Sequence, residues 1–199
     1  MISEPIPAGA TRGWYQIAFA NQVPAESVRQ IRVFGHRLAL FRTRSGTVAV
    51  LDDHCAHYGH SVSSGDVSGE CLECPLHRWT WSVTGTLVQA PKASLVDRRR
   101  FRARAWHTQE IGPLILLYVG EADGHLAGLR AELEILRTAA QPISTWDVGV
   151  GPALDIDGDS LSVESSIQDG VTVTVIQAWT PTEGDEVRRF RTVVRSAAG

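Results

Sequence analysis

The sequence is poor in the residues that cross-link small secreted proteins. It has only three cysteines in 199 residues, and all three lie between residues 55 and 74. A disulfide framework needs an even number of cysteines, spread along the chain so that each bond closes a loop. These cysteines are therefore better suited to metal or redox chemistry than to disulfide bonds.

Long hydrophobic runs and an excess of positive charge are also missing. The longest apolar run lies in residues 111–120 and is too short to span a bilayer, so we interpret it as a buried strand. The N-terminal residues MISEPIPAGATRG contain neither the basic nor the apolar segment of a secretory signal. The formal net charge of −3 argues against nucleic-acid binding, which usually needs a strongly basic face. We expect a cytoplasmic protein with no nucleic acid and no membrane among its partners.

Short β-branched and aromatic runs, separated by Asn, Gly, Pro and Ser, dominate the N-terminal part of the chain. These runs are GWYQIAFA, QIRVFGHRLALFR, TVAVLDD, TLVQA and FRARAWHTQEIGPLILLYVG. Gly112-Pro113 in the last run predicts a turn between two strands. We therefore expect one all-β domain over residues 12–120.

Residues 121–199 are expected to form a small α+β region. A short amphipathic helix ending before Pro142 is predicted by leucines at spacings of three and four: Leu126, Leu129, Leu133 and Leu136. Three later runs, LSVESSI, VTVTVIQAW and EVRRFRTVV, predict an antiparallel meander with hairpin turns at Asp157-Gly158 and Asp169-Gly170.

One segment, residues 55–79, carries thiols and imidazoles at ligand spacing. Cys55 and His57 form a C-x-H pair, and Cys74 and His77 form a C-x-x-H pair. Two thiolates and two imidazoles can hold either a zinc ion or an iron–sulfur cluster. Zinc fingers and ribbons commonly pair like with like, whereas each half of this segment mixes one Cys with one His. Mixed pairs favour a cluster in which each loop sends one ligand to each of two irons.

This segment and its surroundings resemble the N-terminal domain of Rieske non-haem iron oxygenases of the ketosteroid-hydroxylase type. The matching stretches, in order, are GWYQIAFANQVP, RLALFRTRSGTVAVLDDHCAHYGH, SGDVSGECLECPLHRWTW and VTGTLVQAP. The resemblance implies a Rieske-type antiparallel β-sandwich with a two-loop cluster-binding subdomain. It also implies a [2Fe–2S] cluster in which Cys55 and Cys74 bind one iron and His57 and His77 bind the other.

Two departures distinguish this chain from the high-potential Rieske proteins of respiratory complexes. Those proteins join their loops by a disulfide, at positions that are His60 and Leu76 here. They also place Ser and Tyr hydroxyls where this chain has Trp79 and Trp81. Since hydrogen bonds to the sulfurs raise the potential, we expect a value in the lower part of the Rieske range, roughly −150 mV to about 0.

Other residues of the segment carry weaker signals. Ala56 and Arg78 stand where the family usually has Pro and Gly, which bears on loop geometry and not on ligation. Cys71 lacks ligand spacing and is expected to be a free, half-buried thiol. His54 and His60 flank the predicted ligands, and we expect them to be packed or solvated.

The family resemblance also implies a mononuclear iron, held by two histidines and a carboxylate in a C-terminal domain. This sequence has no histidine after His125, so we expect no such site in that part of it. The function predicted is single-electron transfer in a Rieske-type oxygenase system. The partners implied are an electron-donating reductase or ferredoxin and a separate non-haem iron oxygenase subunit, with a homotrimer by analogy.

Two other functions stay open on the sequence. One is an oxygenase-like protein whose cluster is structural or redox-sensing, or whose C-terminal domain binds a small molecule; the other is a zinc-binding module. The arginine run DRRRFRAR, residues 97–104, fits a docking face for an acidic electron donor or a solvated strand face.

Overall fold

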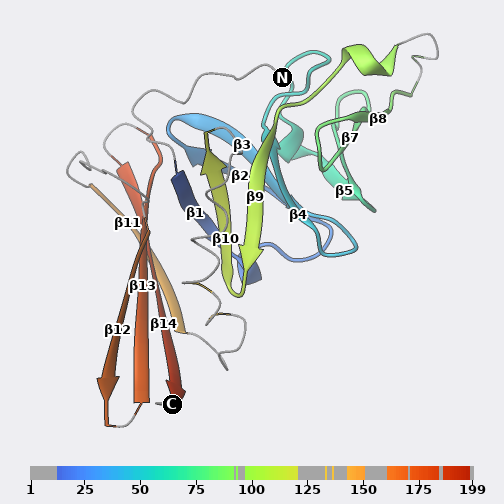
Figure 1. Ribbon diagram of the computed structural model, residues 1–199. Helices are drawn as coiled ribbons and strands as arrows, with labels where there is room; N and C mark the ends of the chain where they lie inside the picture. The colour runs from blue at the N-terminus through green and yellow to red at the C-terminus, as the bar shows by residue number, and fades with distance from the viewer. Residues whose placement is uncertain are drawn as a thin grey trace. The chain divides into compact units, whose positions relative to one another are not determined.

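Most of the described residues lie in antiparallel β-strands, which confirms the mainly β fold class (Figure 1). The computed structural model describes residues 13–91, 93, 97–120, 133, 136, 143–150, 161–169, 171–183 and 186–197. The chain divides into two compact units, a first unit of residues 21–108 and a second unit of residues 1–20 with 109–199. The domain boundaries 12–120 and 121–199 stay a prediction, because a compact unit need not coincide with a domain.

The first unit contains a sheet in which each strand is antiparallel to the next. Its strands are β2 (Ser27–Val33), β3 (His36–Arg42), β4 (Val48–Asp52) and the first residues of β9 (Ala105–Ile111). The turn between β2 and β3 uses Phe34 and Gly35, both with positive φ (49° and 73°), as a type I′ hairpin turn requires. The run QIRVFGHRLALFR is therefore two strands.

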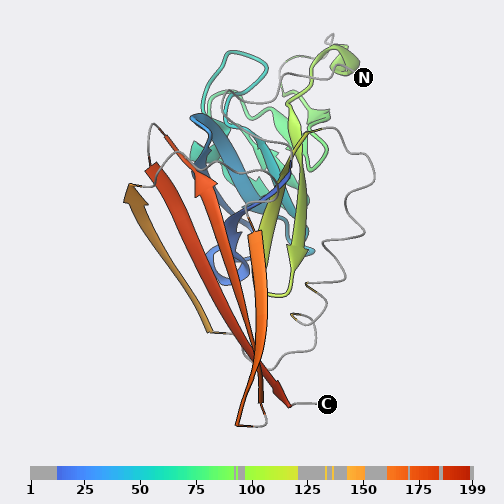
Figure 2. The ribbon, with the colours of Figure 1, turned by 60° about the vertical axis from the view of Figure 1, so that its left-hand side comes forward.

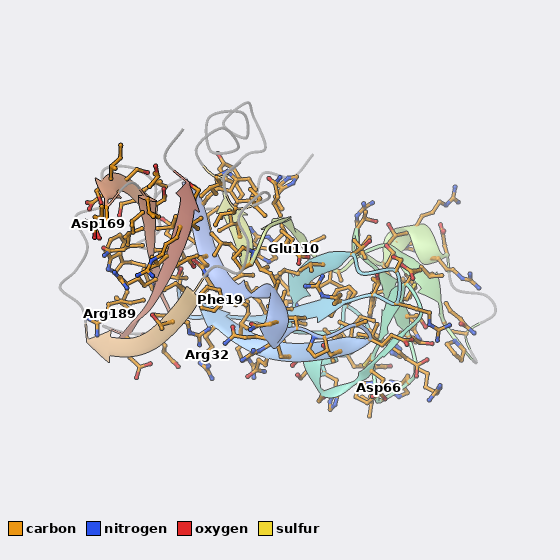
Figure 3. The ribbon with its side chains drawn as sticks, turned by 90° about the horizontal axis from the view of Figure 1, so that it is seen from below. Phe19, Arg32, Asp66, Glu110, Asp169 and Arg189 are labelled. Carbon is orange, nitrogen blue, oxygen red and sulfur yellow. The ribbon has the colours of Figure 1, made fainter. Side chains whose placement is uncertain are left out.

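A second, smaller sheet in the same unit has the order β5, β6, β7, β8, and it confirms the predicted two-loop subdomain. The strands are β5 (Asp66–Ser68), β6 (Cys71–Glu73), β7 (Thr80–Ser82) and β8 (Leu87–Gln89). Asp66, labelled in Figure 3, marks the first of them. Short 3₁₀ turns in the described part of the chain are η1 (Ala20–Gln22), η2 (Val62–Ser64) and η3 (Arg98–Arg100).

The two sheets of the first unit share one hydrophobic core. Its buried members come from both sheets and from the loops between them: Ala39, Phe41, Leu51, Cys55, Val62, Leu72, Cys74, Trp79, Trp81 and Leu87. Burying one large apolar side chain stabilises a fold by about 1.5–3 kcal/mol. Because Cys55 and Cys74 belong to this core, the predicted ligand loops are fixed by the same packing that stabilises the unit.

The second unit pairs β1 (Gly13–Phe19) with β10 (Leu114–Val119), which follows β9 through the predicted Gly112-Pro113 turn. It also contains a four-stranded sheet in the order β11, β14, β13, β12, whose long strands are spread out in Figure 2. Those strands are β11 (Ile143–Val150), β12 (Leu161–Gln168), β13 (Val171–Pro181) and β14 (Glu186–Ala197). The meander β12–β13–β14 is confirmed, whereas β11 was not predicted.

The turns and helix predicted for residues 121–199 are described only in part. Asp169, labelled in Figure 3, lies at the turn between β12 and β13 with φ of 50°, as predicted. Leu133 and Leu136 are helical and buried. Leu126, Leu129 and the Asp157-Gly158 turn lie outside the described residues.

The core of the second unit joins β1 and β10 to the four-stranded sheet. Phe19, labelled in Figure 3, meets Phe190 edge to face with ring centroids 5.5 Å apart. The hydroxyl of Thr180 donates to the carbonyl of Gln16 at 2.6 Å, within the buried interior. Among the described residues, no helix is long and apolar enough to cross a membrane.

Gly85, in the turn between β7 and β8, packs closely against the backbone of Ala103. A Cβ atom there would lie 1.9 Å from the carbonyl oxygen of Ala103, and the φ of Gly85 is 73°. Gly35 has the same φ, but nothing lies within 4 Å of its Cβ position. We expect Gly35→Ala to cost about 1–2 kcal/mol from backbone strain alone, and Gly85→Ala to cost clearly more. Denaturant unfolding of both variants measures the difference, and equal losses would show that the turn can move away from Ala103.

Candidate metal centre

Two loops of the first unit carry the four predicted ligands. The first loop, residues 53–65, follows β4 and contains Cys55 and His57. The second loop, residues 74–79, joins β6 to β7 and contains Cys74 and His77. Both loops leave strands that end in the common core, so the frame that holds them is rigid.

The backbone makes the same pair of hydrogen bonds around each cysteine. The amide of the cysteine donates to the carbonyl five residues later, and the amide four residues later donates back to the carbonyl of the cysteine. Both distances are 2.7 Å around Cys55 and 2.9 Å around Cys74. Each cysteine therefore begins a closed turn of the same size, and the histidine of its pair lies inside that turn.

The fourth residue after each cysteine adopts a positive φ, 72° at Gly59 and 59° at Arg78. Glycine accepts this conformation freely, whereas another residue type pays roughly 1–2 kcal/mol. Arg78 pairs with Glu73 at 2.9 Å, but its side chain is 71% exposed, and such a pair contributes about 0–1 kcal/mol. The departure from the family's usual Gly thus leaves the loop conformation in place and adds strain to it.

A buried carboxylate fixes the start of the first loop. Asp53 is 1% exposed and accepts hydrogen bonds from the Gln30 side-chain amide, from the Ser61 hydroxyl at 2.9 Å and from the Ser63 backbone amide at 2.7 Å. Buried carboxylates are costly unless they are hydrogen-bonded in this way. Asp53 therefore ties the two ends of the first loop to each other and to β2.

The two loops approach each other most closely at Gly65. A Cβ atom there would lie 2.0 Å from the carbonyl oxygen of Glu73 and 2.9 Å from Cδ of Pro75. Only glycine allows this contact between the backbones of the loops. The roles of Asp53 and Gly65 were missed from the sequence, because neither position has ligand chemistry and their partners are distant along the chain.

The sulfur side of the site is buried. Cys55 and Cys74 are each 2% exposed. Burial raises the pKa of the Cys55 thiol, the backbone N–H of His57 opposes this effect, and Cys74 adds to it. Two adjacent thiolates in such surroundings need a cation to stabilise them, and ferric iron supplies one.

The imidazole side of the site reaches the surface. The rings of His57 and His77 have centroids 4.8 Å apart, and His77 is exposed. His57 stacks on Trp79 at 4.0 Å with an interplanar angle of 5°. Burial, and after it the neighbouring His77, lower the pKa of His57, which favours the neutral form that binds metal. Tyr58, 75% exposed, lies beside both rings.

The arrangement fits a two-iron cluster better than a single ion. A tetrahedral zinc would need all four donor atoms within about 2.0–2.3 Å of one point. Among the described residues, which include all four predicted ligands, no three His, Cys, Asp or Glu side chains surround one ion position. A buried sulfur pair and a separate imidazole pair are the donor set of a [2Fe–2S] cluster with one Cys₂ and one His₂ iron.

The other described histidines and Cys71 are not among the four predicted ligands. Cys71 is half-buried in β6, and burial raises its pKa. His36 meets the ring of Trp106 edge to face at 6.2 Å. His54, His60 and His107 are exposed, and His125 lies outside the described residues.

The arginine run lies on η3 and on residues 101–104, which lead into β9. Arg98, Arg99 and Arg100 are exposed, and Asp97 caps the turn by accepting from the amide of Arg99. Phe101, in the middle of the run, packs edge to face on Trp79 with ring centroids 4.9 Å apart. The run is therefore joined to His57 through two ring contacts.

The strain at Arg78 predicts an unusual order of stability among variants. Arg78→Gly removes the strain, and Arg78→Ala keeps it while losing the Glu73 ion pair. We expect the Gly variant to be about 1 kcal/mol more stable than the Ala variant, although Ala is the better residue in most regular structure. Denaturant midpoints measure this difference, and an Ala variant at least as stable as the Gly variant would contradict the positive φ.

Comparison with known proteins agrees with this geometry. Residues 13–99 match the model of the Rieske [2Fe-2S] domain family. The oxygenase component of 3-ketosteroid-9-alpha-monooxygenase from Mycolicibacterium smegmatis is 31% identical over 113 residues, which are 57% of this chain and 29% of that protein. Cholesterol 7-desaturase nvd 1 from Ciona intestinalis is 27% identical over 135 residues, 67% of this chain and 27% of that protein. This chain thus spans less than a third of the length of either relative.

Solved structures of oxygenases share the fold. Dicamba monooxygenase bound to dicamba superposes with a TM-score of 0.72 and 16% identity, over 92% of this chain and 77% of that one. The terminal oxygenase of carbazole 1,9a-dioxygenase from Novosphingobium sp. KA1 gives a TM-score of 0.71 and 14% identity, over 94% and 74%. The fold likeness thus extends well beyond the ligand loops. Residues 13–99 thus match the Rieske [2Fe-2S] domain, which implies a [2Fe–2S] cluster, and the chain is similar to Rieske-type oxygenase components.

Proposed function

We propose that this protein carries single electrons within a Rieske-type oxygenase system. Cys55 and Cys74 bind one iron of the cluster, and His57 and His77 bind the other. When bound, a [2Fe–2S] cluster of this kind accepts and releases one electron at a time. The observation that carries the proposal is the separation of a buried sulfur pair from an imidazole pair at the surface.

The residues around the site suit an electron carrier. The buried cysteines keep water away from the sulfurs, while His77 and Tyr58 bring the other side of the site to the surface, where a partner can approach. Asp53 fixes the first loop, and Gly65 packs that loop against Glu73 and Pro75. These residues bind and orient the ligands, and no described residue is needed as an acid or base for this role.

The electrons are passed to a non-haem iron bound outside this sequence. Iron sites that activate oxygen use two imidazoles and a carboxylate with open coordination positions. The part of the sequence after His125 has no imidazole. Substrate chemistry in the system is therefore assigned to a different polypeptide segment.

The electron donor is a reductase or ferredoxin with an acidic surface, and it docks at Arg98–Arg102. The three arginines of η3 are exposed, and Phe101 links this segment to His57 through Trp79. Opposite charges on two proteins speed their encounter and fix their orientation. One solved relative is an oxygenase in complex with a ferredoxin, which is consistent with such a donor.

Ligand substitution tests the cluster assignment. Replacing Cys74 by Ser should abolish the visible absorption and the electron paramagnetic resonance signal of the reduced protein. Cys71→Ser is the matched control and should retain both, because Cys71 has no ligand neighbours. Iron and acid-labile sulfide should each be close to about two per chain in the wild type. Zinc in place of iron, or a fully loaded Cys74→Ser protein, would refute the assignment.

Charge reversal tests the docking surface. We expect the double variant Arg98→Glu/Arg100→Glu to be reduced by an acidic ferredoxin at least about tenfold more slowly at low ionic strength, with the difference shrinking as salt is added. Arg195→Glu on β14 makes a similar change of charge in the second unit and should react like the wild type. Stopped-flow absorption measures the rates. Equal rates for all three proteins would place the donor elsewhere.

A further inference from the structure

One face of the His57 ring lies flat against a buried tryptophan. The rings of His57 and Trp79 are stacked, with centroids 4.0 Å apart and an interplanar angle of 5°. Trp79 is 2% exposed and belongs to the hydrophobic core of the first unit. Since protein interiors are close-packed, a ring in such a core has little room to turn. The His57 ring therefore lies on a surface whose orientation is fixed.

Phe101 supports Trp79 in turn. The two rings meet edge to face at 86°, with centroids 4.9 Å apart. This is one of the geometries that aromatic pairs prefer. Trp79 ends the second ligand loop, whereas Phe101 follows η3, so the row of three rings joins both ligand loops to the arginine run. The position of Trp79 is thus determined by more than its own loop.

The other rings that contact His57 are less able to fix its plane. Tyr58 is tilted by 52° at a centroid distance of 4.2 Å, and its side chain is 75% exposed. His77 meets the His57 ring at 71° and is exposed. Exposed side chains change rotamer within nanoseconds, so neither offers a fixed surface. Of these three neighbours, Trp79 alone is both buried and parallel to His57.

We infer that Trp79 is a positioning residue that fixes the ring plane of His57 for metal binding, and that Phe101 supports it in this role. A free imidazole must lose rotamer freedom when it binds a metal, whereas a stacked imidazole is already ordered. Groups that orient a metal ligand typically account for about 10–100-fold in metal affinity. In the sequence, Trp79 marks only a missing hydroxyl donor; in the structure it supports a ligand. The inference rests on the proposed ligation by His57.

The first test is the rate at which the loaded protein loses its cluster to an iron chelator, followed by visible absorption. We expect Trp79→Leu to lose the cluster about tenfold faster than the wild type. Trp79→Phe keeps a flat ring and should stay close to the wild type, and Phe101→Leu should fall between the two. Leu87→Ala is the packing control, because Leu87 is a buried aliphatic member of the same core. Cluster loss from Leu87→Ala as fast as from Trp79→Leu would mean that Trp79 only fills the core, and would overturn the inference.

The second test observes the ligands directly. Electron nuclear double resonance of the reduced protein, labelled with ¹⁵N-histidine, reports the iron-bound imidazole nitrogens. In Trp79→Leu we expect the coupling of one nitrogen to broaden or change orientation while the other stays the same. Trp106→Leu is the matched control, because Trp106 contacts His36, which is not a predicted ligand, and both couplings should stay at their wild-type values.

The outcomes separate the inference from the proposed ligation. A loaded Trp79→Leu protein with the wild-type rate of cluster loss and wild-type couplings would overturn the role of Trp79 and leave the ligation intact. If Trp79→Leu does not load, Phe101→Leu is measured instead, and the same change, smaller in size, is expected; its absence would equally overturn the inference. A wild-type protein that shows no imidazole nitrogen coupling would overturn the ligation by His57 and His77 itself.

Discussion

The pair of backbone hydrogen bonds that closes the turn at each cysteine is the interaction on which the site depends. These bonds set the same turn after Cys55 and after Cys74, although the histidine follows at different spacings in the two loops. The turns place two sulfurs inside the core and two imidazoles near the surface. The proposed electron carrier role follows from that division.

Packing and electrostatics act together in the same few residues. Trp79 belongs to the hydrophobic core, yet its ring also stacks on His57 and contacts Phe101 of the arginine run edge to face. Trp81 belongs to the same core as Cys55 and Cys74. The core of the first unit is therefore the inner surroundings of the metal centre, and substitutions in it are expected to change stability and redox properties at once.

The sequence predicted much of this, and the failures have physical reasons. The predicted ligand pairs stood out because ligation restricts both residue type and spacing, and their ligation stays a prediction. The meander was recognisable because its strands are long and separated by turn residues. The strand β11 was missed because its pairing partner, β14, is distant in sequence. Asp53 and Gly65 were missed for a similar reason: their importance comes from contacts with Gln30 and Glu73, which no local pattern reveals. In the sequence, the positive φ of Arg78 was indicated only by an arginine at a position where the family usually has glycine.

The close contact of the two loops at Gly65 has a consequence for the speed of electron exchange. Since the backbones already touch, and Asp53 ties the first loop at both ends, the ligands have little freedom to shift when the charge between them changes. In a preorganised environment of this kind, the surrounding groups need little energy to rearrange when the reaction occurs. In the electron-transfer role proposed above, such a frame favours a low reorganisation energy, so that an electron can enter and leave with nearly the same geometry around it.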